Sequence, residues 1–280
     1  MNQALNESAA KSFLSPNVFR IAIPCQNLDA SEDFYVKKLG YSLKQKHPDR
    51  IMIDFSGALI VSYLFPEKND NLPQIYPRHF GLVLPDTDSY NTILARAAEK
   101  QLDFIQESQL KRKGQAGKQL NFYIKDPANN IIQFSYWIGK KAIIVNEAMN
   151  GNFEESIFST TISHVAIPCK NIDDTENFYV NRLGCSLAKK YSDRIVINFW
   201  GSLIVCHLYP EKADKVAEIY PRHFGIVLSN QTAYNYILKN AKENHLDFLQ
   251  ESQIDRSEES LSFYLKDPAN NAVKFQVSLN

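Results

Sequence analysis

The segment YPRHFGLVL, residues 76–84, returns later in the chain as YPRHFGIVL, residues 220–228. The two copies differ at one position, and each places a histidine directly before a short apolar run. A segment that recurs at a spacing of domain size predicts an internal duplication. The chain has 280 residues, which is enough for two ordinary domains.

The duplication extends over most of the chain. Arg20 aligns with His164 and His79 with His223 at the same spacing. The register then changes at one loop, which reads KRKGQAGKQ in the first repeat and DRSEES in the second. We predict a disordered N-terminus over residues 1–16, a first domain over 17–137, a linker over 138–160 and a second domain over 161–280.

Each repeat predicts the element order βαβββ twice. In the first repeat, apolar runs bounded by turn residues predict strands over residues 18–24, 41–46, 50–55, 58–64, 79–84, 102–108, 120–126 and 130–137. Helices are predicted over 28–40, with Asp29 or Ser31 as the N-cap, and over 86–101. The fold class is therefore α+β, with four βαβββ modules that form two curved sheets.

Composition excludes several classes of protein. The chain has 31 basic and 31 acidic residues, which gives no general attraction to nucleic acid or anionic membranes. No apolar run reaches the length of a membrane span. Four cysteines are too few for a disulfide scaffold, so we expect reduced thiols and a cytoplasmic protein. Because the chain carries two repeats, we also expect a monomer or a homodimer.

Strand alternation places polar residues on the sheet face opposite the helices. In the first strand Ile21 and Ile23 share the face that packs on a helix, so Arg20 points the other way. Small neighbours leave room on that second face, which a curved sheet can close into a cavity. The six polar positions on this face are Arg20, His79 and Gln133 in the first repeat, and His164, His223 and Lys274 in the second. Periodicity leaves open whether they form a site or are structural.

Three motifs recur in both repeats in the same order. They read HVAIPCKNIDDTENFYVNRLGCSL, PRHFGIVL and FYLKDPANNAVKF in the second repeat, and FRIAIPCQNLDASEDFYVKKLGYSL, PRHFGLVL and FYIKDPANNIIQF in the first. The chain thus resembles the vicinal oxygen chelate superfamily of glyoxalase I, bleomycin-resistance proteins and extradiol dioxygenases. The resemblance implies two glyoxalase-like domains in tandem, with metal-dependent chemistry on a small molecule that bears adjacent oxygens.

The resemblance also implies a ligand set, from which this chain departs. The superfamily uses a His, Gln or Glu on the first strand, a His on the fifth and a Glu on the eighth. The corresponding triplets within each repeat are Arg20, His79 and Gln133, and His164, His223 and Lys274. Arginine stays protonated and lysine binds metal only after it loses its proton, so neither triplet suits a divalent ion.

Members of the superfamily also exchange modules between domains, and the sequence leaves this alternative open. Exchange would bring His164 to His79 and Gln133, a metal set without a carboxylate. It would also bring Arg20 to His223 and Lys274, a cationic set that attracts an anion. We therefore expect either no metal or at most one divalent ion of iron, manganese, zinc or nickel.

Two further pairs are candidate site residues. Tyr63 and His207 occupy matching strand positions, where they are either catalytic proton donors or ordinary strand residues. Arg78 and Arg222 precede the repeated histidines, where they either clamp an anionic substrate or are solvated. Two functions remain open: a metal-dependent dioxygenase, lyase or isomerase, and a metal-free small-molecule-binding protein of the resistance or sensor type.

Overall fold

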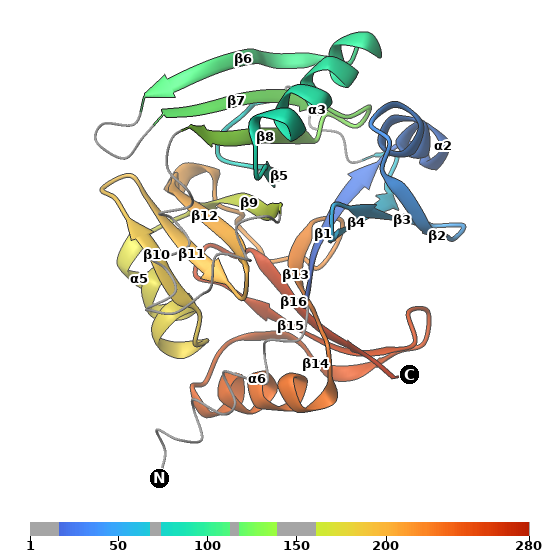
Figure 1. The fold of residues 1–280 in the computed structure, drawn as a ribbon. Helices are drawn as coiled ribbons and strands as arrows, with labels where there is room; N and C mark the ends of the chain where they lie inside the picture. Colours follow the sequence, from blue (N-terminus) through green and yellow to red (C-terminus); the bar gives the residue numbers. More distant parts are fainter. Residues whose placement is uncertain (1–16, 68–73, 113–117, 139–160, 280) are drawn as a thin grey trace.

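The computed structural model describes residues 17–67, 74–112, 118–138 and 161–279. The predicted disordered N-terminus and residues 139–160 of the predicted linker lie outside these ranges. Within the described ranges, no helix has the length and apolar character needed to cross a membrane. Figure 1 shows the arrangement of the elements named below.

The element order in each repeat is the predicted βαβββ twice. The first repeat comprises β1 (Val18–Cys25), α2 (Leu28–Glu32), η1 (Asp33–Lys38), β2 (Ser42–Lys46), β3 (Arg50–Phe55), β4 (Ala58–Leu64), β5 (His79–Val83), α3 (Thr87–Glu99), β6 (Phe104–Arg112), β7 (Lys118–Lys125) and β8 (Ile131–Ile138). The second comprises β9 (Ile162–Cys169), α5 (Ile172–Glu176), η4 (Asn177–Arg182), β10 (Ser186–Lys190), β11 (Arg194–Phe199), β12 (Ser202–Leu208), η5 (Pro210–Lys212), β13 (His223–Leu228), α6 (Gln231–Glu243), β14 (Phe248–Asp255), β15 (Ser260–Lys266) and β16 (Ala272–Ser278).

The first helix begins at Leu28, the first residue of the predicted range, but its N-cap is not a predicted one. Asn27, in extended backbone, is the N-cap of α2, and its side chain accepts a hydrogen bond from the backbone N–H of Ala30 at 2.9 Å. The prediction of Asp29 or Ser31 as the cap was therefore wrong, because both lie inside the helix. Asn171 caps α5 in the same way, and each helix continues as a π-helical turn, η1 or η4.

Each sheet combines one module from each repeat. Sheet A has the strand order β14-β15-β16-β13-β1-β4-β3-β2, and sheet B has the order β10-β11-β12-β9-β5-β8-β7-β6. The joining strands are antiparallel, with Arg20 opposite Gly225 in sheet A and Gly81 opposite His164 in sheet B. The modules are therefore exchanged, which is one of the two arrangements that the sequence left open.

The two modules of one repeat are held together by aromatic packing. Phe55 of sheet A lies 6.0 Å from Phe80 of sheet B between ring centroids, and in the second repeat Phe199 lies 6.1 Å from Phe224. Each fully buried ring stabilises the fold by roughly 1.5–3 kcal/mol. A repeat is thus a unit of core packing, whereas the hydrogen-bonded sheets join different repeats. All four cysteines are buried with free thiols.

The repeated KDPANN motif builds a turn between strands. The Asp126 carboxylate accepts hydrogen bonds from the backbone of Ala128 and Asn130 at 2.9 and 2.8 Å, and from the Tyr35 hydroxyl at 2.9 Å. The Asn130 side chain donates to the Pro24 carbonyl oxygen at 2.9 Å. The second repeat builds the same turn around its matching aspartate. This motif therefore ties the turn before β8 of sheet B to β1 of sheet A, and the matching turn before β16 of sheet A to β9 of sheet B, so its part in the fold is structural.

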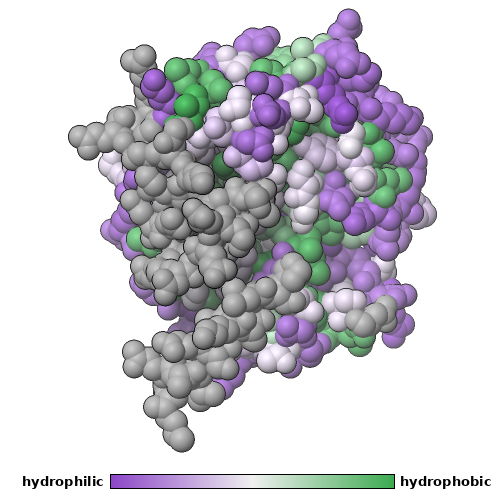
Figure 2. Space-filling view, in the orientation of Figure 1, coloured by the Kyte–Doolittle hydropathy of each residue, from purple (hydrophilic) through white to green (hydrophobic). Residues whose placement is uncertain are grey.

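The four modules lie around a common centre, with α3, α5 and α6 on the periphery (Figure 1). In the space-filling view, hydrophilic residues cover much of the visible described surface and hydrophobic residues form smaller groups between them (Figure 2). The helix-facing residues predicted from alternation, including Ile21, Ile23, Phe80 and Phe134, are buried in one core. The opposite faces of the two sheets are left for the polar residues described next.

Candidate functional site

Exchange of the modules brings His79, His164 and Gln133 together on sheet B. The Nε2 atom of His164 lies 3.0 Å from Oε1 of Gln133, and the rings of His79 and His164 are 5.7 Å apart between centroids. These residues line a cavity of about 120 Å³, which we call the histidine cavity. His207 lies in the same cavity, with its ring 6.3 Å from that of His79.

A glycine allows these strands to lie close together. Gly81 pairs with Gln133 on one side and His164 on the other. A Cβ atom at Gly81 would collide with the backbone carbonyl oxygen of Gln133. Gly225 has the same relationship to Lys274 in sheet A. The glycine of each repeated HFG segment is therefore required by close backbone approach beside the polar residues.

A hydrogen bond and burial constrain the protonation of His79 and His164, respectively. Nδ1 of His79 lies 2.8 Å from the carbonyl oxygen of Ile75, and since a carbonyl only accepts, Nδ1 carries the proton. In the neutral ring of His79, Nε2 is then the nitrogen that carries the lone pair. Burial is the main cause that lowers the pKa of His164 to about 3, and electrostatic interaction with the nearby imidazoles of His79 and His207 lowers it further. His164 is therefore neutral at physiological pH.

Cationic and aromatic side chains form the rest of the histidine cavity. Lys111, Lys189 and Arg194 line it, and no aspartate or glutamate does so among the described residues. The Lys111 ammonium lies 5.4 Å from the ring centre of Tyr123. Arg194 is paired with the neighbouring Asp193 at 2.9 Å, so its charge is partly compensated. The lining as a whole favours a negatively charged occupant.

The second exchanged set, Arg20, His223 and Lys274, meets on sheet A. Here the position of an occupant is taken by a carboxylate of the chain itself. Glu258, in the turn between β14 and β15, accepts a hydrogen bond on each carboxylate oxygen from the Arg20 guanidinium, both at 2.7 Å. The Lys274 ammonium donates to the same carboxylate at 3.3 Å. We call this region the arginine pocket.

Neutral side chains complete the arginine pocket. Gln276 donates to Glu258 at 2.8 Å and accepts from Arg20 at 3.0 Å. The Tyr63 hydroxyl accepts from Arg20 at 2.9 Å, so the predicted pair Tyr63 and His207 divides between the two sites. Burial alone would lower the pKa of Arg20, yet the Glu258 carboxylate, together with Tyr63 and Tyr264, outweighs burial and raises that pKa. Burial is also the first cause that lowers the pKa of Lys274, to about 8.

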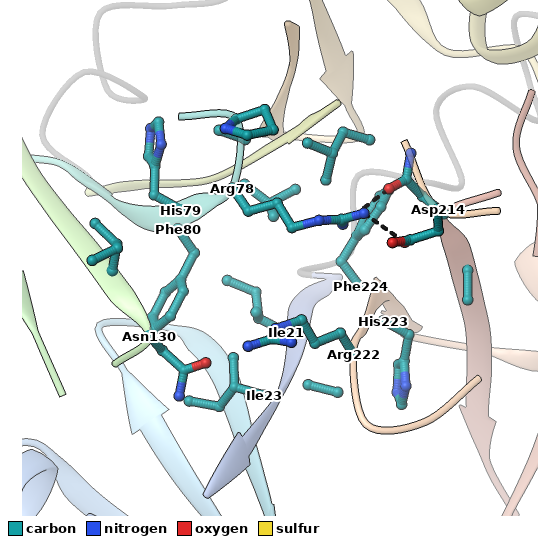
Figure 3. A pocket seen from close by; sticks show the side chains of 18 of the residues that line it. Ile21, Ile23, Arg78, His79, Phe80, Asn130, Asp214, Arg222, His223 and Phe224 are labelled. Carbon is teal, nitrogen blue, oxygen red and sulfur yellow. Dashed lines mark hydrogen bonds and ion pairs between the residues drawn. The ribbon is translucent and has the colours of Figure 1, made fainter. Parts of the chain in front are cut away.

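The predicted clamp residues Arg78 and Arg222 do not join either set. They line a separate cavity of about 390 Å³ between the two sheets. Figure 3 shows Arg78 directed at Asp214, with which it forms an ion pair, while His79 and His223 point away from this cavity in opposite directions. A substrate-binding role for the two arginines stays a prediction.

The comparisons with known proteins agree with this architecture. A family model described as Glyoxalase/Bleomycin resistance protein/Dioxygenase superfamily matches residues 17–134. The chain belongs to this superfamily. Its two eight-stranded mixed sheets fit two tandem glyoxalase-like α+β domains that exchange modules, and neither sheet is closed.

The chain is also similar to solved structures. A glyoxalase/bleomycin resistance protein/dioxygenase from Alicyclobacillus acidocaldarius is 33% identical over 45% of this chain and 95% of its own, with a TM-score of 0.43. Glyoxalase I from Zea mays is 12% identical over 93% of this chain and 90% of its own, with a TM-score of 0.58. A variant of that enzyme is 11% identical over 97% of this chain and 96% of its own, with a TM-score of 0.61. At such identities the maize structures show a common fold alone. None of the curated proteins compared matches the chain.

Members of the superfamily commonly bind a divalent metal. The residues of the histidine cavity fit such an ion poorly. His79 has the tautomer of a metal ligand, but His164 turns Nε2 to the Gln133 amide oxygen, which requires the proton on Nε2. Among the described lining residues no carboxylate offsets the charge of an ion, and Lys111, Lys189 and Arg194 add positive charge to the cavity. Across the described ranges, no group of three or more His, Cys, Asp or Glu side chains is placed to hold a metal ion.

Glu258 was not predicted as a site residue from the sequence. Glu258 belongs to the DRSEES loop, which differs in length and charge from KRKGQAGKQ in the first repeat. That contrast was the available signal: one loop carries three acidic residues and the other carries none. Alternation along strands cannot find such a residue, because the loop reaches the pocket from outside the sheet.

Proposed function

We propose that the histidine cavity binds a small organic acid through protein side chains alone. The observation that carries the proposal is the lining: three cationic side chains and, among the described residues, no carboxylate. A cavity of one charge sign with low-dielectric walls concentrates ligands of the opposite charge. The arginine pocket supports the same class of ligand, because its equivalent position in sheet A holds the carboxylate of Glu258.

The imidazole of His79 adds a second requirement. Its Nε2 is an acceptor, because Nδ1 donates to Ile75. A ligand that carries a hydroxyl beside its carboxylate can donate to this nitrogen while Lys111 and Lys189 attract the carboxylate. His207 and Gln133 also line the cavity, where we expect them to contact the ligand. The proposed class is therefore a small hydroxy acid.

The size of the cavity limits the ligand. Its volume of about 120 Å³ is well below the roughly 300 Å³ at which cavities begin to hold drug-sized ligands. The aromatic rings of Tyr76, Tyr123 and Tyr191 form part of the lining and would pack against an aliphatic body of a few carbons. The proposal is thus a binding protein of the resistance or sensor type, and no reaction is assigned to it.

The alternative is a divalent ion at His79, His164 and Gln133. It requires His164 to lose its hydrogen bond to Gln133 and a cationic cavity to accept two further charges. Elemental mass spectrometry of untagged protein, prepared without chelators, measures it directly. Near one ion per chain that is lost in His164→Ala and kept in His223→Ala would favour the ion over the proposed organic acid.

The proposal is tested by calorimetric titration with glycolate and acetate, which differ by one hydroxyl. One added hydrogen bond corresponds to about tenfold in affinity, so glycolate should bind about tenfold more tightly than acetate. His79→Ala should remove this preference and leave acetate binding in place, while Lys189→Met should weaken both. Equal affinities in the wild type, or a preference that survives in His79→Ala, would contradict the proposal.

A further inference from the structure

Glu258 occupies the arginine pocket as a ligand would. Its side chain is 4% exposed, and it meets the side chains of Arg20 and Lys274, both 0% exposed. The fork-to-fork geometry with Arg20 is that by which arginine recognises free carboxylates. The pKa of Glu258 is held below its usual range by Arg20 and Lys274, against the effect of burial, so the group is a carboxylate at neutral pH.

The pocket offers more hydrogen-bonding groups than Glu258 uses. Nδ1 of His223 donates to the Ile219 carbonyl oxygen at 2.8 Å, so Nε2 carries a lone pair. This Nε2 and Nε of Arg20 are buried without a hydrogen-bond partner in the described structure. Buried polar groups are nearly always paired, and exceptions point to function or to an absent ligand. His223 is 4% exposed, so solvent at the surface does not satisfy it.

Glu258 also separates the pocket from an open cleft. A cleft of about 570 Å³ is lined by Tyr63, Tyr264 and Glu258, whereas Arg20 and His223 do not line it. The carboxylate and the two tyrosines therefore stand between solvent and the buried cations. The other residues of the turn, Arg256 to Glu259, are exposed, so the turn has room to move outward.

We propose that the arginine pocket is a second binding site, for a small carboxylate ligand that displaces Glu258. The incoming carboxylate takes the hydrogen bonds of Arg20 and Gln276, and a neighbouring hydroxyl donates to Nε2 of His223. The turn between β14 and β15 then opens toward the cleft, where Asp255 remains 3.9 Å from Lys274. This proposal concerns sheet A and does not depend on the histidine cavity of sheet B.

The first arm of the test vacates the pocket. Acetate is titrated into Glu258→Ala and wild type, with binding followed by calorimetry and by the shift in melting temperature. Acetate should bind Glu258→Ala at least tenfold more tightly than wild type and raise its melting temperature, while sodium chloride at equal ionic strength should not. Glu258→Gln keeps the size of the side chain and serves if the alanine variant does not fold. Glu259→Ala is the matched control in the same turn.

The second arm follows displacement in the wild type. Hydrogen exchange at the amides of residues 256–259 should accelerate on addition of acetate, reaching a plateau as the pocket fills, with the core strands unchanged. A tethered group competes at an effective concentration on the order of millimolar or more, so acetate must exceed that range. No acetate binding by either Glu258 variant beyond that of the wild type would overturn the site. Binding by a variant without faster exchange of the wild-type turn would overturn displacement.

Discussion

Arg20 and Glu258 form a bidentate ion pair at 2.7 Å although 238 positions separate them in the sequence. Arg20 lies on the first strand of the first repeat, and Glu258 lies in the turn between β14 and β15 of the second. The pair therefore exists only because the modules are exchanged. It also explains how a fully buried arginine is tolerated where the superfamily places a metal ligand, since the carboxylate compensates its charge.

Glu258→Gln should destabilise the protein by about 3–5 kcal/mol, the usual effect of leaving a buried charge without its partner. Urea unfolding at pH 7 measures this, with the exposed Glu259→Gln as the matched control, expected within about 0.5 kcal/mol of wild type. Equal effects of the two substitutions would show that the ion pair contributes no more than a surface contact.

Gly81→Ala should destabilise by about 1–3 kcal/mol, since its Cβ atom would press on the carbonyl oxygen of Gln133. The same change should weaken glycolate binding, because β5 and β8 must move apart at the histidine cavity. Gly225→Ala, whose Cβ atom would meet the Lys274 carbonyl oxygen in sheet A, is the matched control, which should destabilise similarly and leave the histidine cavity unchanged. Unfolding free energies and glycolate titrations of both variants would decide the point.

Stability should fall with pH below about 6.5. His164 has a pKa of about 3 when folded and 6.5 as the ordinary value, so only the unfolded chain takes up a proton in that window. The contribution of neutral His164 to the free energy of unfolding is fully present above pH 6.5. It is lost progressively as the pH falls, at about 1.4 kcal/mol per pH unit. Urea unfolding between pH 4.5 and 7.5 should therefore show a smaller slope for His164→Asn than for wild type.

Glu258 should cause a second loss of stability at low pH. Its pKa is lowered in the folded state from the ordinary 4.5, so its stabilisation is present above 4.5 and is lost as the pH falls below that value. Glu258→Gln should therefore remove part of the loss below pH 4.5 and leave the slope between 4.5 and 6.5 unchanged. A change in the pH dependence of stability only between pH 4.5 and 6.5 would contradict this role of Glu258.

The fold was accessible from the sequence because it depends on local patterns repeated four times. Alternation assigned Ile21 and Ile23 to the core and Arg20 to the opposite face, and the duplicated segments fixed the element order. Residue patterns could not decide whether the modules are exchanged, because β1 and β13 pair through backbone hydrogen bonds that the sequence of neither strand indicates. Glu258 escaped for a related reason: a turn residue follows no strand periodicity.

The most direct test of the central proposal observes the histidine rings in metal-free wild-type protein. Ring nitrogen-15 spectra would be recorded during titration with glycolate in the presence of a chelator. We predict saturable shifts of the His79 and His164 signals, with Nε2 of His79 responding as a hydrogen-bond acceptor. If both rings stay unchanged with glycolate and shift only when zinc or iron is added, the histidine cavity is a metal site and the proposed binding of an organic acid is wrong.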